Sequence, residues 1–203
     1  MSRPARKNII LVHGAGVYHG RSNLFALRKP LEVFGANVEE FRYGLVLVLW
    51  GWWRTKNGSK ALAKLLQPFD IVVTHSNGVL VADGAMSERM KSAIPPGVRL
   101  VALSPACASD RIFAQGWDRV DVIYNPGDNL SWFADHIPWH PWGDMMSTGI
   151  LDRPLQSYEH QFSTVEILKV NVDVEHGEYL REPYINRFAR GLWEKVLSPC
   201  TPK

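Results

Sequence analysis

The sequence is poor in cysteine, with two cysteines among its 203 residues. Cys107 and Cys200 give neither the framework of a disulfide-stapled domain nor the paired spacing of a structural zinc site. Two unpaired cysteines fit a reducing compartment, where thiols stay reduced. We therefore expect a cytoplasmic protein.

Long hydrophobic runs are also absent. The apolar run from Ile9 to Val12 is too short for the core of a signal peptide, and the stretch from Leu45 to Trp53 contains Gly51. A helix needs about 20 apolar residues to span a bilayer. We expect no transmembrane segment.

Neither sign of charge is in large excess. Lys and Arg number 23 against 20 Asp and Glu, which gives a net charge of +3, and the one dense basic run (Arg3, Arg6 and Lys7) lies at the N-terminus. Nucleic-acid-binding domains usually carry a clustered basic stripe, so we expect no nucleic-acid partner. The 46% hydrophobic content is ordinary for globular proteins, and it predicts one folded domain over residues 1–203.

Strand-like and helix-like segments alternate along the chain. The predicted strands are Asn8 to Val12, Asn37 to Arg42, Asp70 to Thr74, Val98 to Leu103, Val120 to Tyr124 and Val165 to Val172. The predicted helices are Ser22 to Phe34 (with Pro30 expected to kink or split it), Ser59 to Leu66, Asn77 to Met90 and Glu178 to Val196. Such alternation predicts an α/β fold, a three-layer α/β/α sandwich with a mainly parallel sheet of about six strands.

Two segments outside these elements are expected to form a lid or the rim of a site. The stretch from Asn125 to Tyr158 is longer than a plain connection, and such stretches are usually functional. We expect residues 129–158 and 43–58 to take this role. Six of the eight tryptophans lie in these regions, and they serve either as packing or as pocket lining. The pocket candidates are Trp50, Trp132 and Trp142.

The sharpest motif is Thr74-His75-Ser76-Asn77-Gly78, which lies between a buried strand and a helix. A serine at this kind of turn is held in a strained conformation with its hydroxyl raised above the edge of the sheet. Small residues two places before and after the serine let the strand and helix approach closely. Gly78 meets that demand, whereas Thr74 stands where glycine is usual. A serine that only caps the helix is the competing interpretation.

A second motif, His13-Gly14-Ala15-Gly16, follows the first strand directly. Glycines at such a turn let backbone N–H groups face a developing oxyanion. A phosphate-binding loop is the alternative, but no Gly-Lys-Ser/Thr sequence follows it.

These two motifs resemble the nucleophile elbow and the His-Gly loop of the α/β-hydrolase superfamily. The resemblance covers the chain from Asn8 to about Val196, without the first two strands of the full fold. It implies Ser76 as nucleophile, with His75 beside it at the pocket. It also implies an oxyanion hole made by the Gly14–Ala15 loop, which follows His13, and by Asn77.

The family order of Ser, then acid, then His points to two further residues. His176 lies between the last strand and the last helix, and a neutral imidazole suits a general base. Asp128, just past the fifth strand, would hold the histidine tautomer, although an Asp after Pro-Gly is also an ordinary turn residue. The reserve acids are Asp110, Asp135, Asp144 and Asp152.

The expected activity is therefore that of a serine hydrolase cleaving a small-molecule carboxylic ester or thioester through an acyl-enzyme. An acyltransferase with the same triad and a non-catalytic binding protein of the same fold are the alternatives. His136, His140 and Asp144 could be taken for a metal cluster, but their loop context does not support it. We expect no metal and no cofactor.

Overall fold

The computed structural model describes residues 7–14, 23–43, 51–107, 111–124, 161–166 and 178–198, and of residues 51–53 and 161–166 it describes the backbone alone. The strands are β1 (Asn8–Val12), β2 (Asn37–Phe41), β3 (Ile71–His75), β4 (Arg99–Leu103), β5 (Arg119–Tyr124) and β6 (Gln161–Glu166). The helices are α1 (Arg28–Val33), α2 (Gly51–Leu65), α3 (Gly78–Arg89) and α6 (Ile185–Leu192). Short 3₁₀ helices η1 (Asn23–Leu27) and η3 (Glu178–Leu180) and the π-helix η4 (Trp193–Leu197) accompany them.

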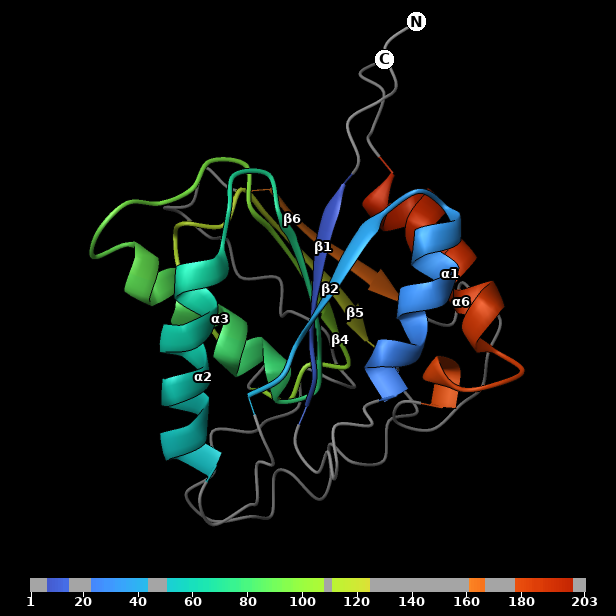
Figure 1. Cartoon of the computed structure of the whole chain (residues 1–203), viewed down its shortest axis with the longest axis horizontal. Helices are drawn as coiled ribbons and strands as arrows, with labels where there is room; N and C mark the ends of the chain where they lie inside the picture. Colours follow the sequence, from blue (N-terminus) through green and yellow to red (C-terminus); the bar gives the residue numbers. More distant parts are fainter. Residues whose placement is uncertain are drawn as a thin grey trace, which may run out of the picture.

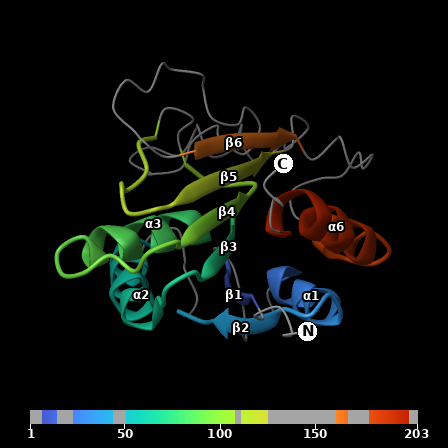
Figure 2. The ribbon, with the colours of Figure 1, turned by 90° about the horizontal axis from the view of Figure 1, so that it is seen from above.

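The six described strands form one sheet in the order β2-β1-β3-β4-β5-β6, and every neighbouring pair is parallel. Figure 2 shows this order from above, with β2 at one edge and β6 at the other. The chain runs from β1 out to β2 and then crosses back to β3 on the opposite side of β1. In open parallel sheets such a change of direction leaves a crevice at the carboxyl ends of the strands, where ligands bind.

Helices cover both faces of the sheet, as the sequence predicts. Helices α2 and α3 lie on one face, and α1 and α6 lie on the other (Figures 1 and 2). Successive strand residues alternate between two buried apolar clusters. Val72 packs with the α2 and α3 side, and its neighbours Ile71 and Val73 pack with the α1 and α6 side. Burial on both faces explains why the central strands are continuous apolar runs, and the predicted three-layer α/β/α fold is confirmed.

Two predicted boundaries are wrong for identifiable reasons. Helix α2 begins at Gly51, eight residues before the predicted start at Ser59. Glycines in the segment lower its helix propensity, so the sequence signal for a helix is weak. In the structure Gly58 packs closely against Tyr43, because a Cβ on Gly58 would lie 3.0 Å from the Cβ of Tyr43. The last strand, β6, begins at Gln161 rather than Val165. It is an edge strand in which polar and apolar residues mix, so it lacks the continuous run that marks the central strands.

The helices at the two ends of the chain are more divided than predicted. The first is split into η1 and α1, with Pro30 in the first turn of α1, where its missing N–H is not needed. The last is divided into η3, α6 and η4 rather than running unbroken from Glu178. Pro183 lies between η3 and α6, where a residue without an N–H interrupts a helix.

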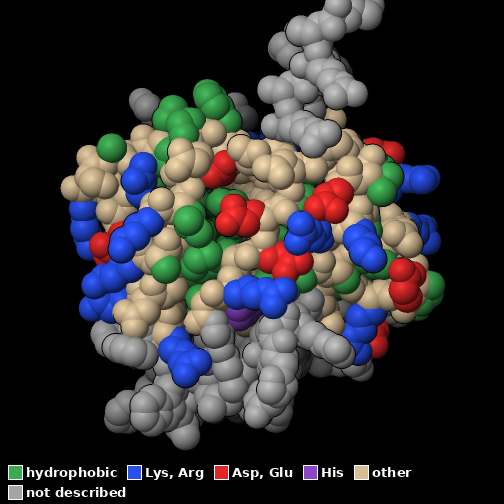
Figure 3. Space-filling model, viewed as in Figure 1, with side chains coloured by type: hydrophobic (Ala, Val, Ile, Leu, Met, Phe, Trp, Pro, Cys, Tyr) green, Lys and Arg blue, Asp and Glu red, His purple; other side chains and the backbone are tan. Residues whose placement is uncertain are grey.

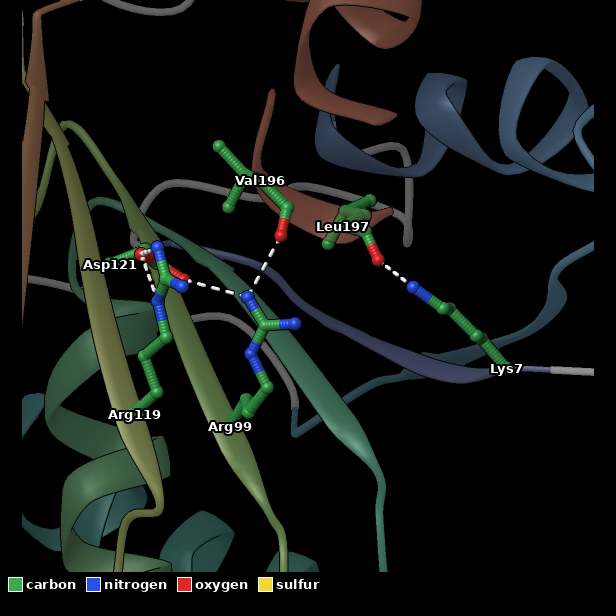
Figure 4. A network of polar contacts seen from close by, with 6 residues as sticks. All are labelled: Lys7, Arg99, Arg119, Asp121, Val196 and Leu197. Carbon is green, nitrogen blue, oxygen red and sulfur yellow. Dashed lines mark hydrogen bonds and ion pairs between the residues drawn. The ribbon is translucent and has the colours of Figure 1, made fainter. Parts of the chain in front are cut away.

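A buried ion-pair network lies where β4 and β5 begin, at the opposite edge from the carboxyl ends of the strands. Asp121 is fully buried, and its carboxylate accepts bonds from Arg99 at 3.0 Å and Arg119 at 2.7 Å. Arg99 also donates to the Val196 carbonyl at 2.8 Å, near the end of η4 (Figure 4). The network ties the C-terminal helix to the sheet.

Basic and acidic side chains are interspersed over the face of the molecule seen in Figure 3. No helix in the described part of the chain is long and apolar enough to cross a membrane.

Candidate functional site

Ser76 lies in a sharp turn between β3 and α3, with a backbone φ of +52°. A residue with a Cβ enters this left-handed region at a cost of roughly 1–2 kcal/mol. Neighbouring backbone holds the conformation: the Ser76 N–H donates to the Leu103 carbonyl at 3.1 Å, and the Ser76 carbonyl accepts from the Ala106 N–H at 3.2 Å. Strain kept in place by surrounding bonds is typical of functional turns, and it is the conformation that the elbow motif predicts.

The residues two places before and after Ser76 explain how the turn is packed. A Cβ on Gly78 would lie 2.4 Å from the Val12 carbonyl oxygen and 2.7 Å from that of His13, so the start of α3 touches the end of β1. Thr74, which stands where the family usually has glycine, is fully buried. Its hydroxyl donates to the Val101 carbonyl at 3.4 Å, so the larger side chain keeps a hydrogen-bond partner.

The His13-Gly14 turn lies directly against the serine. A Cβ on Gly14 would meet the Ser76 Cβ at 2.8 Å and the Ser76 Oγ at 3.4 Å, so only glycine fits without displacement of the elbow. Both residues follow the carboxyl ends of β1 and β3, the strands between which the sheet order reverses. The sequence predicts this neighbourhood, and the structure places Gly14 and Ser76 in it.

His13 is buried behind the turn. Its Nδ1 lies 2.7 Å from the Gly14 carbonyl oxygen, which can only accept, so Nδ1 carries the proton. The ring stacks on Tyr43 at 4.3 Å and meets Phe25 edge-on. Burial lowers the pKa of His13, opposed by the bond to Gly14 and assisted by the nearby Arg42 charge. A neutral His13 thus serves to fix the turn.

Asn77 follows the serine and is also buried. Its side-chain amide donates to the Tyr43 Oη and to the Thr55 Oγ1, each at 3.4 Å, and it makes no capping bond to α3. The Asn77 backbone lies at the start of α3, where amides have no acceptor within the helix and face anions favourably. Its placement is compatible with the role of oxyanion donor that the sequence suggests.

His75 precedes the serine, and its ring lies on the face of the sheet that α1 and α6 cover, where Tyr179 also packs. Its ring is 6.2 Å from that of Tyr179, in an edge-on arrangement. Tyr179 is fully buried in η3, and its hydroxyl donates to the Ser104 Oγ at 3.1 Å. Ser104 lies just past β4 and has a positive φ of +40°. The segment that begins at Glu178 therefore packs beside the elbow.

Sequence reasoning missed Tyr43, Tyr179 and Ser104. Each is a polar residue one or a few places beyond a strand or a predicted site residue, and that position was the available signal. The other site predictions lie outside the described residues: His176, Asp128, Ala15, Trp50, Trp132 and Trp142, with the reserve acids Asp110, Asp135, Asp144 and Asp152. The same holds for the predicted rim segment 129–158 and for residues 44–50.

No protein-family model matches the chain, and no curated protein matches its sequence significantly. Solved structures do resemble it. A candidate hydrolase of the alpha/beta superfamily from Xanthomonas campestris pv. campestris is 16% identical, with 93% of this chain and 99% of that chain covered and a TM-score of 0.53. Aspergillus fumigatus lipase B is 15% identical, with 96% and 53% covered and a TM-score of 0.59. Est1E from Butyrivibrio proteoclasticus, with bound ferulic acid, is 15% identical, with 96% and 90% covered and a TM-score of 0.51.

These similarities extend over more than nine tenths of this chain. At such identities they bear on the fold alone, and this is the fold that the resemblance in the sequence implies. The chain has the α/β-hydrolase fold.

Proposed function

We propose that this protein is a serine hydrolase that cleaves a carboxylic ester or thioester through an acyl-enzyme. The carrying observation is the strained Ser76 turn against Gly14, where a Cβ would meet the serine Cβ at 2.8 Å. A strained serine beside a glycine turn suits nucleophilic attack with nearby oxyanion donors. One of the similar structures is named as a lipase, an enzyme that hydrolyses carboxylic esters.

His176 is the proposed general base. It is three residues from Tyr179, and since successive Cα atoms are 3.8 Å apart, their Cα atoms are at most about 11 Å apart. The Tyr179 ring itself contacts His75, next to the nucleophile. Chain connectivity thus favours a histidine within reach of Ser76.

Asp128 is the proposed acid. It follows Tyr124, the last residue of β5, by four positions. The carboxyl ends of parallel strands lie at one edge, so Tyr124 lies on the same side of the sheet as Ser76, and this closeness in sequence supports Asp128 as the acid.

In this scheme the Ser76 Oγ attacks the acyl carbon while His176 accepts the hydroxyl proton. The carbonyl oxygen becomes an oxyanion, facing the amides of Asn77 and the Gly14–Ala15 turn. Collapse of the intermediate breaks the ester or thioester bond, and His176 returns the proton to the departing alcohol or thiol. Water then repeats the sequence on the acyl-enzyme and releases the acid.

Turnover of a panel of p-nitrophenyl esters and acyl thioesters tests the proposal. S76A and H176A should lose activity by up to roughly 10⁶-fold, because triad members act as a unit. D128N should lose about 10⁴-fold. S87A, which removes an exposed serine of α3, is the matched control and should turn over like the wild type. Equal turnover by wild type and S76A would exclude the proposed nucleophile.

A further inference from the structure

One tyrosine contacts both sides of the predicted oxyanion hole. The Tyr43 hydroxyl donates to the His13 carbonyl at 2.9 Å and accepts from the Asn77 side-chain amide at 3.4 Å. His13 precedes the Gly14 turn at the end of β1, and Asn77 precedes α3. A single hydroxyl thus joins two segments that are more than 60 positions apart in the sequence.

The ring of Tyr43 is held in place by packing on both sides. It lies flat on the His13 imidazole, with the ring planes 8° apart. Helix α2 packs behind it, because a Cβ on Gly58 would lie 3.0 Å from the Tyr43 Cβ. From the same helix, Thr55 accepts the second bond of the Asn77 amide. The hydroxyl therefore has little freedom to move away from its two partners.

We propose that Tyr43 is a positioning residue that holds the His13-Gly14 turn and Asn77 at a fixed separation, so that oxyanion stabilisation depends on its hydroxyl. The inference rests on the proposed function, since it concerns the hole that faces the Ser76 acyl intermediate. Amides that stabilise an oxyanion act through preorganisation, and displacement of about 1 Å can lower a rate by up to roughly 10²-fold. Tyr43 does not need to touch the substrate for this effect.

The phenol keeps its donor hydrogen over a wide pH range. Burial raises the pKa of Tyr43 well above its usual range, opposed by the bond from Asn77. Loss of the hydroxyl should therefore lower the rate by the same factor at neutral and alkaline pH. A role in proton transfer would instead change the shape of the pH profile.

The test is Y43F, which keeps the stacked ring and removes only the hydroxyl. With p-nitrophenyl acetate we expect kcat to fall about tenfold, less than for loss of an entire oxyanion donor, with KM unchanged within about twofold. Y184F is the matched control, because Tyr184 is an exposed tyrosine before α6, and it should behave as the wild type. The melting temperature of each variant separates a catalytic loss from loss of fold.

A double-mutant cycle with N77L sharpens the test, since leucine removes the amide that bonds to Tyr43 and keeps the Asn77 backbone N–H. The two losses in kcat should overlap in the double variant rather than multiply. If Y43F does not fold, N77L decides alone, and an unchanged kcat overturns the inference.

The remaining outcomes separate this inference from the proposed function. An unchanged kcat in Y43F, or a rise in KM alone, overturns the positioning role while an inactive S76A leaves the serine mechanism intact. Turnover by S76A equal to wild type, or no turnover by the wild type, overturns both.

Discussion

The two ends of the central strands differ in what they hold: a strained turn at the carboxyl ends and a buried ion-pair network at the amino ends. At the carboxyl ends, the chain adopts a φ of +52° at Ser76 and packs Gly14 and Gly78 against neighbouring atoms with no room for a side chain. At the amino ends, the buried Asp121 is satisfied by two arginines (Figure 4). One edge holds a strained serine turn, and the other holds paired charges.

The amino-end edge also holds the end of η4. Arg99 and Lys7 donate to the last carbonyls of η4, those of Val196 and Leu197. Cations suit this place because the C-terminal carbonyls of a helix carry partial negative charge. The comparison teaches that, under the proposed function, stability and activity depend on different edges of one sheet, so variants at the two edges should separate the two properties.

Replacement of the strained serine by glycine should have the largest effect. S76G removes the proposed nucleophile and should lower turnover by up to roughly 10⁶-fold. It should also raise the free energy of unfolding by about 1 kcal/mol, because glycine adopts a positive φ without strain. S76A, which keeps the strain, should be equally inactive without that gain. Denaturant melts and ester turnover check both, and equal stability of S76G and S76A would contradict the strain at this edge.

Loss of the buried carboxylate should have the reverse profile. D121A leaves Arg99 and Arg119 without their shared partner, and breaking such a pair lowers the free energy of unfolding by about 3 kcal/mol. The kcat of the folded fraction should not change. D118N, at an exposed aspartate one position before β5, is the control and should be neutral. A fall in kcat with D121A would show that the two edges are coupled.

A Cβ at Gly78 should lower both properties together. In G78A the new methyl meets the backbone carbonyls of Val12 and His13, so we expect a loss of about 2 kcal/mol in stability and a lower kcat. In G84A, on the same helix, the methyl meets the Ser59 side chain instead. G84A should lose stability alone, which a comparison of melting temperature with kcat will detect.

The smallest expected effect is a pH dependence from His13. Burial lowers the pKa of His13 in the folded state below the ordinary histidine value of about 6.5, so between those two pKa values the unfolded chain binds more protons. Stability should therefore fall as pH drops from about 6.5 towards the folded pKa. H13Q should flatten that slope in urea melts across mildly acidic pH. An identical slope in H13Q would assign the dependence to other groups.

The elements that the sequence predicts well are those with a strong local signal. The apolar run of β3 and the turn around Ser76 locate the elbow. Burial on both faces of the sheet requires a continuous apolar strand, and a strained strand-to-helix turn requires small residues around the serine, so both features are visible in a few consecutive residues. The early start of α2 was not predictable, since packing of Gly58 on Tyr43 overrides the weak helix propensity there. Tyr43 and Tyr179 escaped notice because their roles depend on distant partners, which no short motif records.

Mapping of a fluorophosphonate adduct by mass spectrometry tests the central claim most directly. The account predicts one adduct on Ser76, absent in S76A and strongly reduced in H176A, because the serine reacts only when it is activated by its base. Labelling of Ser76 that does not depend on His176 would contradict the proposed base. No adduct on Ser76 in folded wild-type protein would contradict the claim that this turn presents an activated nucleophile.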